Sequence, residues 1–168
     1  MIAVIADTHM PKGRRALPQQ CLELLAAAEL IVHAGDWSKL EVLEMFEAIG
    51  PPIVGVRGNV DDVAIRRRLP ERAMFEAGGR SVGVVHDAGA KHGRTARMRK
   101  AFPDAAAVIF GHSHAPLLAR DDADGFQIFN PGSPTERRHS PVPTMGTLEV
   151  ARGGRLQFRL VELGCSPG

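Results

Sequence analysis

Seven side chains in the sequence are of types that bind divalent metal ions, and each stands shortly after an apolar run. They are carboxylates, imidazoles and one amide, with no thiol among them: Asp7, His9, Asp36, Asn59, His86, His112 and His114. Such donors suit Mn²⁺, Fe²⁺, Zn²⁺ or Ni²⁺ and do not suit Cu(I) or an iron–sulfur cluster. Seven side chains are too many for one ion, whereas two catalytic ions that share one carboxylate would use them all. The set therefore predicts a hydrolase with two metal ions.

The apolar runs before these residues have the composition of buried strands. Five such runs lie at 2–6, 31–34, 53–56, 82–85 and 108–110. The carboxyl ends of parallel strands meet at one edge of an α/β sheet, so the seven side chains would converge there. A single aspartate at a strand end is more often a turn residue or a helix cap, but the coincidence across five strands favours a metal site. His33 lies inside a run, so we interpret it as a core histidine and not as a ligand.

The first third of the chain alternates between strand and helix patterns. Strand composition is found at 2–6, 30–34 and 52–56, and helical patterns lie between these runs, at 18–29 and from 38 to about 49. Neighbouring parallel strands need crossover connections, which are usually helices. This part of the sequence therefore predicts a parallel sheet with helices packed outside it.

The remainder of the chain is richer in hairpin patterns. Two strands at 73–77 and 81–85 flank a glycine turn, and a last hairpin joins 146–151 to 156–163. Between them we expect a helix at 95–102, a strand at 107–110, and a strand pair at 117–120 and 126–129. The whole pattern predicts an α/β protein with two packed sheets flanked by helices. We expect one domain over residues 1–168, with a flexible tail at about 164–168.

The composition of the chain excludes several classes of binding partner. The 21 Lys and Arg residues against 19 Asp and Glu residues leave a net charge of +2, too small for a dedicated DNA or membrane-surface binder. Aromatic residues make up only 5% of the chain, so we expect no dedicated nucleic-acid platform. The apolar stretches are shorter than the ~20 residues that cross a bilayer, and residues 2–6 lack the flanks of a secretory signal. Cys21 and Cys165 do not suggest a disulfide framework. We therefore expect a cytoplasmic protein with no membrane partner.

The ordered motifs resemble those of the calcineurin-like metallophosphoesterase superfamily, in particular its small single-domain bacterial and archaeal phosphodiesterase branch. The resemblance spans nearly the whole chain and rests on six segments: Asp7-Thr8-His9, Gly35-Asp36, Gly58-Asn59, His86, Gly111-His112-Ser113-His114 and Asn130-Pro131-Gly132-Ser133. It implies a four-layer α/β/β/α sandwich with two mixed sheets, the metallophosphoesterase fold.

The same resemblance implies how the seven side chains divide between two divalent ions. The first ion would be held by Asp7, His9, Asp36 and His114, and the second by Asp36, Asn59, His86 and His112, with Asp36 as the bridge. Mn²⁺ is the expected ion, with Fe²⁺, Zn²⁺ and Ni²⁺ as alternatives. A hydroxide that bridges the two ions would attack phosphorus, so no serine or cysteine nucleophile is expected.

Two positions depart from the pattern of the superfamily. Many relatives carry a histidine directly after the motif asparagine, where it can protonate the leaving group, but this chain has Val60 there, followed by Asp61. We expect Asp61 to orient a ligand or a water and not to donate a proton. His86 is followed by Asp87 where relatives commonly carry glycine, and we expect Asp87 to lie behind the ligands.

We therefore expect a metal-dependent phosphodiesterase that hydrolyses a small phosphodiester or a nucleotide. One alternative is a phosphomonoesterase with the same two-metal site. A second alternative is a non-catalytic protein-interaction scaffold of the same fold. The sequence leaves a homo-oligomer open.

Overall fold

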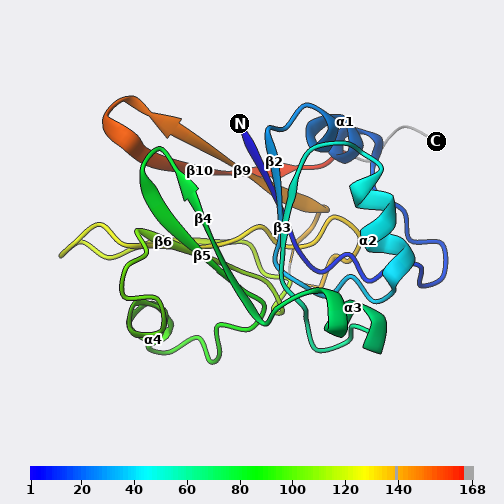
Figure 1. The fold of residues 1–168 in the computed structure, drawn as a ribbon, viewed down its shortest axis with the longest axis horizontal. Helices are drawn as coiled ribbons and strands as arrows, with labels where there is room; N and C mark the ends of the chain where they lie inside the picture. The colour runs from blue at the N-terminus through cyan, green and yellow to red at the C-terminus, as the bar shows by residue number, and fades with distance from the viewer. Residues whose placement is uncertain (139, 165–168) are drawn as a thin grey trace.

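Two five-stranded sheets face each other in the computed structural model, which describes residues 1–138 and 140–164 (Figure 1). The first sheet has the order β10-β9-β1-β2-β3 and the second the order β4-β5-β6-β8-β7. The strands of the first sheet are β1 (Ile2–Ile5), β2 (Leu30–His33), β3 (Ile53–Gly55), β9 (Thr144–Ala151) and β10 (Arg155–Glu162). Those of the second are β4 (Arg72–Ala77), β5 (Arg80–Val85), β6 (Ala107–Phe110), β7 (Leu117–Arg120) and β8 (Gln127–Asn130). The helices are α1 (Gln19–Ala26), α2 (Leu40–Glu47), α3 (Val63–Arg68) and α4 (Arg94–Ala101), with a 3₁₀ turn at Arg152–Gly154.

The first sheet combines parallel and antiparallel pairs. Strands β1, β2 and β3 are parallel neighbours, and β9 pairs antiparallel with both β1 and β10. Helices α1 and α2 connect the parallel strands, and their apolar faces cover the outer face of this sheet. Cys21 and Leu25, one helical turn apart, are buried on α1, and Val42 and Phe46 have the same spacing on α2. The amphipathic spacing therefore fixes which face each helix presents to the sheet.

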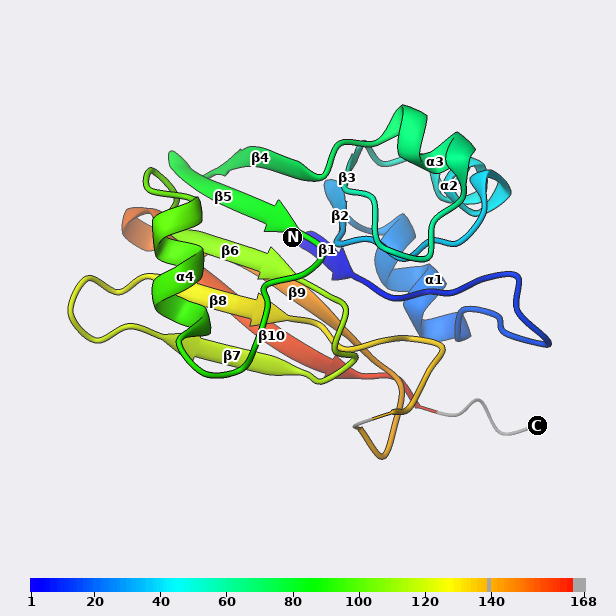
Figure 2. The ribbon, with the colours of Figure 1, turned by 90° about the horizontal axis from the view of Figure 1, so that it is seen from below.

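The second sheet is also mixed. Strands β4 and β5 form an antiparallel hairpin, β5, β6 and β8 are parallel, and β7 runs antiparallel to β8. Figure 2 shows α4 lying across this sheet, far from α1 and α2. Met98 of α4 is buried in an outer cluster with Phe102, Phe110 and Phe126. One layer of helix therefore covers each outer face, so the four-layer α/β/β/α prediction is confirmed.

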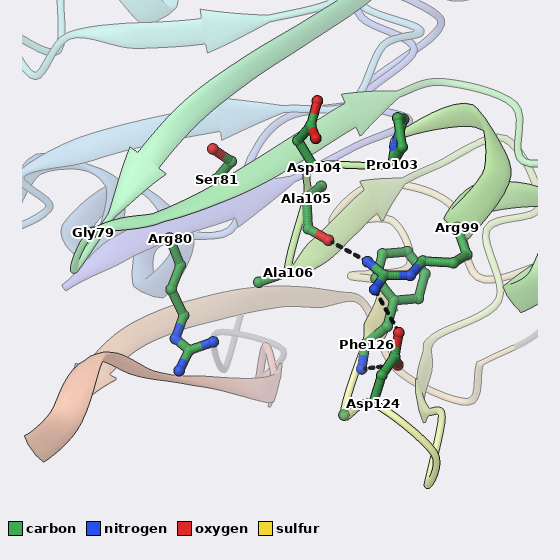
Figure 3. A pocket seen from close by; sticks show the side chains of 11 residues that line it. Gly79, Arg80, Ser81, Arg99, Pro103, Asp104, Ala105, Ala106, Asp124 and Phe126 are labelled. Carbon is green, nitrogen blue, oxygen red and sulfur yellow. Dashed lines mark hydrogen bonds and ion pairs between the residues drawn. The ribbon is translucent and has the colours of Figure 1, made fainter.

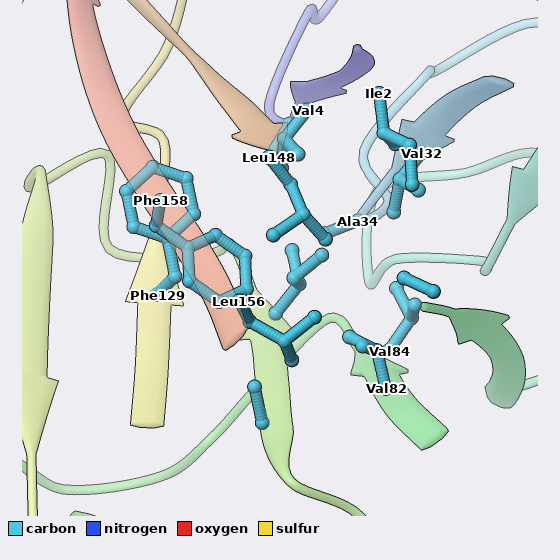
Figure 4. Packing of buried hydrophobic residues seen from close by; sticks show 14 of the residues in the cluster. Ile2, Val4, Val32, Ala34, Val82, Val84, Phe129, Leu148, Leu156 and Phe158 are labelled. Atoms are coloured by element: carbon cyan, nitrogen blue, oxygen red, sulfur yellow. The ribbon is translucent and has the colours of Figure 1, made fainter. Parts of the chain in front are cut away.

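The inner faces of the two sheets share one apolar core (Figure 4). Val4 and Leu148 of the first sheet and Val84 of the second contribute buried side chains to it. The rings of Phe129 and Phe158, one from each sheet, are stacked with centroids 4.9 Å apart. Aligned packing of this kind fixes the position of one sheet relative to the other.

The expected strands and helices are found close to the predicted positions, and the structure adds two features. Helix α3 was not predicted, because the run Arg66–Arg68 has no apolar periodicity; its signal is Asp62, whose side chain accepts a hydrogen bond from the Ile65 N–H at 3.0 Å. The last hairpin joins the first sheet beside β1, a choice that the strand pattern alone does not specify. Within the described residues, no helix has the length and apolar character needed to cross a membrane. His139, Cys165 and the predicted tail beyond residue 164 lie outside the described residues.

Gly146 on β9 lets the two sheets approach each other, and we expect the variant Gly146→Ala to be less stable. A Cβ atom at this position would lie 2.3 Å from Cε1 of Phe129, a ring that is buried and stacked on Phe158. The ring has no space to move, so the expected loss of unfolding free energy is about 1–3 kcal/mol. Urea unfolding of the native chain and of Gly146→Ala measures this loss of unfolding free energy. Gly164→Ala, where a Cβ meets open space, is the control; equal losses in the two variants would contradict this explanation.

Candidate metal centre

The loops after the strands hold their ligand-type residues in an unusual backbone conformation. Five of the seven candidates have φ in the left-handed region: Asp7 at 56°, His9 at 45°, Asp36 at 61°, His112 at 67° and His114 at 53°. Among the described non-glycine residues, only Ser38 shares this property. The left-handed region is sparsely populated and strained, but Asp, Asn and His adopt it more readily than other side chains do. The sharp bends turn these side chains back toward one point at the edge of the two sheets.

The first cluster brings together Asp7, His9 and His114, whose candidate ligand atoms lie within 4.8 Å of one another. The Nε2 atoms of His9 and His114 are 3.0 Å apart, and the Asp7 Oδ1 atom lies 3.6 Å from His114 Nε2. All three side chains are buried. Three inward-facing donors at this spacing could hold one divalent ion.

The second cluster brings together Asp36, His86 and His112, again within 4.8 Å. Asn59 belongs to it as well, because its Oδ1 atom lies 3.0 Å from both His86 Nε2 and His112 Nδ1. His86 Nδ1 lies 2.8 Å from the Ala34 carbonyl oxygen and donates its proton there, which leaves Nε2 free to bind a metal. The structure thus brings all seven sequence-predicted residues into two adjacent clusters.

Asp36 lies between the two clusters and directs one carboxylate oxygen toward each. Its Oδ2 atom is 3.4 Å from Nε2 of His9, and its Oδ1 atom is 3.3 Å from Nε2 of His86. A carboxylate in this position could bind both ions of a two-metal site.

Asp7 is the carboxylate that most needs a cation. The side chain is fully buried, and burial raises its pKa to about 8, although the charge of nearby His86 lowers it. Its Oδ1 atom accepts the His112 N–H at 3.1 Å, whereas Oδ2 has no hydrogen-bond partner among the described residues. A buried acceptor without a donor is costly, and a divalent ion beside it would remove that cost. The donor set therefore fits a metal ion.

His9, His114 and Asp36 have charge states suited to holding a metal ion. Burial lowers the pKa of both His9 and His114, the latter to about 4, so both imidazoles are neutral near pH 7. Burial also acts to raise the pKa of Asp36, but the hydrogen bond and the charge of His86 outweigh it and keep this carboxyl ionised. His86 differs from these groups: burial acts to lower its pKa, but Asp36 outweighs burial and raises it, so this imidazole gives up a proton when a metal binds. Neutral imidazoles and ionised carboxylates are the forms that coordinate metals.

Asp61 ties together the two loops that carry Asp36 and Asn59. It is buried, and its two oxygens accept the backbone N–H groups of Ser38 at 2.7 Å and Gly58 at 2.6 Å. The sequence predicted that Asp61 orients a ligand or a water; the structure shows that it orients the backbone of both loops. Asp87, expected behind the ligands, is exposed and accepts the Gly89 N–H at 2.7 Å, which shapes the loop after β5.

His33 connects the loops after β1 and β2 by hydrogen bonds on the buried side of the site. Its Nδ1 accepts the Gly35 N–H at 3.2 Å, so the proton is on Nε2, which lies 3.2 Å from the Thr8 hydroxyl. The ring is buried and stacked on Trp37, with centroids 3.5 Å apart. Burial holds its pKa well below the ordinary value. His33 is therefore a neutral core residue that supports the site without facing it.

Residues at the end of β8 and just after it hold the loops of the site in place by hydrogen bonds to their backbone carbonyls. The Ser133 hydroxyl donates to the Asp7 carbonyl at 2.8 Å, and the Thr135 hydroxyl donates to the Thr8 carbonyl at 2.7 Å. The Asn130 amide donates to the Gly111 carbonyl at 2.8 Å, just before His112. These bonds connect the loop of the first sheet to the loop of the second.

Glu136 was not identified from the sequence as part of this site. Its largely buried carboxylate lies 3.2 Å from Nδ1 of His114, on the side of the ring away from the cluster, and ion-pairs with Arg15 and Arg138. The two atoms form no hydrogen bond, but the negative charge so close to the outer nitrogen raises the basicity of the His114 ring. Nothing in the local pattern signals this role, because Arg15 and Glu136 meet only in the folded chain.

A different cavity at the far end of the second sheet is not part of the site (Figure 3). It is lined by residues that precede β5 and β6, whereas the candidate ligands follow the strands. Its Arg99 pairs with Asp124 at 2.5 Å and donates to the Ala105 carbonyl at 2.9 Å, and Arg80 donates to the Gly154 carbonyl at 2.7 Å. Both arginines already bind acceptors within the protein, and these contacts hold the surrounding turns together.

Comparisons with known proteins agree with this geometry. The family model described as a calcineurin-like phosphoesterase superfamily domain matches residues 1–153. A "Probable metallophosphoesterase" of Methanothermobacter thermautotrophicus is 30% identical over 166 residues, which cover 98% of this chain and 93% of that protein. A Thermotoga maritima protein solved by NMR superimposes with a TM-score of 0.75 at 27% identity, covering 96% of this chain and 98% of its own. Vps29 of Entamoeba histolytica, complexed with Zn²⁺, gives 0.74 at 21% identity, covers 97% and 99%, and bears on the fold alone.

We expect the variant Asp7→Asn to stabilise the metal-free protein in a pH-dependent way. The Asp7 carboxyl has a higher pKa in the folded chain, about 8, than the ordinary value of 3.8, so it binds its proton more tightly when folded. Its contribution to stability is therefore lost as the pH rises through this range. The Tm of Asp7→Asn should exceed that of the native chain by several degrees near about pH 8 and by little near about pH 4. Thermal unfolding in metal-free buffer measures this, with Asp122→Asn at an exposed position as the control. A Tm difference that is the same at both pH values would contradict it.

Proposed function

Because the chain belongs to the calcineurin-like phosphoesterase superfamily, we propose that it is a phosphodiesterase that depends on two divalent metal ions. The observation that carries this proposal is the position of Asp36, which directs one carboxylate oxygen toward each of the two ligand clusters. A lone ion would need no such shared carboxylate. Two adjacent ions are the usual device for attack on a phosphorus ester.

In this proposal the seven side chains divide into two sets that share Asp36. The first set adds Asp7, His9 and His114, and the second adds Asn59, His86 and His112. The mixture of carboxylate, imidazole and amide donors favours Mn²⁺, with Fe²⁺, Zn²⁺ and Ni²⁺ as alternatives.

The residues of the chain have defined tasks in hydrolysis. Bound ions would supply a water of lowered pKa as the nucleophile and positive charge for the phosphoryl oxygens. The neutral His9 and His114 and the ionised Asp36 hold the ligand positions without first losing a proton. The Ser113 hydroxyl accepts hydrogen bonds from the Asn130 amide and the Ala115 N–H, which suits a spacer and not a nucleophile.

A proton donor for the leaving group is missing from the usual place. Val60 follows Asn59, and its side chain is partly exposed beside the clusters. Asp61 does not replace the missing histidine, because both of its oxygens accept backbone N–H bonds. Substrates whose leaving groups need no protonation therefore suit this site best.

A protein-interaction scaffold is the second candidate, because Vps29 has the same fold over 97% of this chain. The complete set of seven ligand-type side chains favours the enzyme, since a scaffold has little need of it. A phosphomonoesterase would use the same ligands and is separated from a diesterase by its substrates. A cytoplasmic location is part of the proposal, since two cysteines 144 positions apart do not suggest a disulfide framework.

Removal of the shared carboxylate is the direct test of the proposal. The native chain should bind about two Mn²⁺ ions and hydrolyse bis(p-nitrophenyl) phosphate only with added metal. In Asp36→Ala we expect both metal sites to weaken and kcat/KM to fall by more than about 100-fold. Metal analysis and p-nitrophenolate release measure the two effects. The control is Asp124→Ala at the far end of the second sheet. Unchanged metal content and turnover in Asp36→Ala would contradict the site, and no turnover of the native chain with any ion would favour the scaffold.

The missing proton donor predicts a strong dependence on the leaving group. Bis(p-nitrophenyl) phosphate should react about 100-fold to 10,000-fold faster, relative to the uncatalysed rates, than dimethyl phosphate of the same charge, because a general acid contributes that much. Phosphorus NMR follows the alkyl ester, and p-nitrophenyl phosphate reports monoesterase activity in parallel. Equal enhancement of the aryl and alkyl diesters would show that another group donates the proton.

A further inference from the structure

A second part of the substrate has a place to bind beside the metal clusters. A cavity of about 470 Å³ borders Asn59 and His86 of the second cluster and extends from there between the loop after β3, the start of β4 and the end of β5. Cavities of this size hold small organic ligands and are larger than one phosphate group needs. A molecule whose phosphorus lies at the clusters could therefore place one ester arm here.

Three arginines line this cavity: Arg57, Arg66 and Arg72. Two carboxylates, Glu71 and Asp87, also border it, so its formal charge is positive. Glu71 is strongly exposed at the rim and accepts a hydrogen bond from Arg57 at 2.5 Å, and Asp87 accepts the Gly89 N–H. Within the described residues, neither Arg66 nor Arg72 forms an ion pair with a carboxylate. Two guanidinium charges thus remain without an anionic partner among the described residues; that of Arg72 lies over the ring of Phe102, 5.5 Å from its centroid.

The arrangement of Arg57 and Arg66 is fixed before any ligand binds. Arg66 donates to the carbonyl oxygens of Asn59 and Asp61, both at 2.8 Å, and Arg57 donates to the carbonyl oxygen of Arg66 at 3.1 Å. Neutral carbonyls orient these side chains without cancelling the charge of Arg66. Pre-organised guanidinium groups lose little freedom on binding and match the geometry of a phosphate.

The residues that line this cavity also indicate which ligands it would bind poorly. No Phe, Tyr or Trp is among the described residues that line the cavity, and the His86 ring faces the second cluster, so the cavity offers little surface on which a nucleobase could stack. Charge-assisted hydrogen bonds from arginine are the main recognition it provides, and their natural partners are phosphate oxygens.

We propose that this cavity binds a second phosphate group, so that the substrates of the enzyme are phosphodiesters with a further phosphate on one ester arm. The proposal rests on the phosphodiesterase function above and adds the substrate class. The reacting phosphorus lies at the clusters, and the second phosphate, carried by a sugar or a similar linker, meets Arg57, Arg66 and Arg72.

A matched pair of substrates tests this assignment. Thymidine 5′-(p-nitrophenyl phosphate) and its 3′-phosphorylated form have the same leaving group and differ by one phosphate. The native enzyme with Mn²⁺ should prefer the phosphorylated form by about ten-fold or more in kcat/KM, mainly through a lower KM. In Arg57→Gln and Arg72→Gln this preference should fall several-fold, and in the double variant it should approach one. Arg66 is left intact because it also holds the loop of Asn59. Arg155→Gln, at the exposed first residue of β10, removes the same charge elsewhere and should keep the native preference.

A titration that needs no turnover separates the failure of this inference from the failure of the proposed function. Metal-free protein should bind inorganic pyrophosphate, and Arg57→Gln and Arg72→Gln should each weaken that binding about five-fold, whereas Arg155→Gln should not. Any pyrophosphate held at the clusters binds equally in the native chain and in the cavity variants, so only the difference between them reports on the cavity. If neither thymidine ester is hydrolysed, the proposed function fails and the titration alone decides on the cavity. A substrate preference or a pyrophosphate affinity that is the same in the native chain and both cavity variants overturns the inference.

Discussion

The close approach of two buried carboxylates, Asp7 and Asp36, is the constraint on which the rest of the structure depends. Both are almost fully inaccessible, and the charge of Asp36 helps to keep the pKa of Asp7 high. The raised pKa of Asp7 reflects the unfavourable burial of two neighbouring carboxylates, so this arrangement persists only if the surrounding chain holds it in place. The loops after the strands do so with backbone conformations that few residues tolerate, and the unfavourable local energy is balanced by the packing of the two sheets beneath them.

The site is shared between the sheets and therefore depends on their alignment. The first sheet supplies Asp7, His9, Asp36 and Asn59, and the second supplies His86, His112 and His114. The stacked rings of Phe129 and Phe158 fix the sheets against each other, and Ser133 and Thr135 bind the loop after β1 from the segment after β8. A small slip of one sheet would separate the two halves of the site, which explains why hydrogen bonds between the loops reinforce the apolar core.

The sequence was most informative where regular structure dictates position. The end of a strand fixes the position of the residue that follows it, so seven ligand-type side chains after five apolar runs were enough to predict the candidate site. The alternation of strand and helix patterns predicted the layers of the fold. Helix α3 was missed, since three consecutive arginines hide its single capping signal at Asp62. The roles of Asp61 and Glu136 were out of reach for another reason: their partners are backbone N–H groups and side chains of other loops, and loop conformation is not encoded by periodicity. The attachment of the last hairpin to the first sheet likewise depends on tertiary packing.

The left-handed backbone at five of the seven ligand positions also bears on how such a chain would change over generations. Aspartate and histidine tolerate this conformation better than most side chains do, so selection for a stable backbone retains them even where selection for metal binding has ended. Asn59 and His86 lack this second constraint, because their φ values lie outside the left-handed region. A descendant that had abandoned catalysis would lose these two residues first and keep His9 and His112 longer. The identities at positions 59 and 86 are therefore the more sensitive record of whether a lineage still binds its metals.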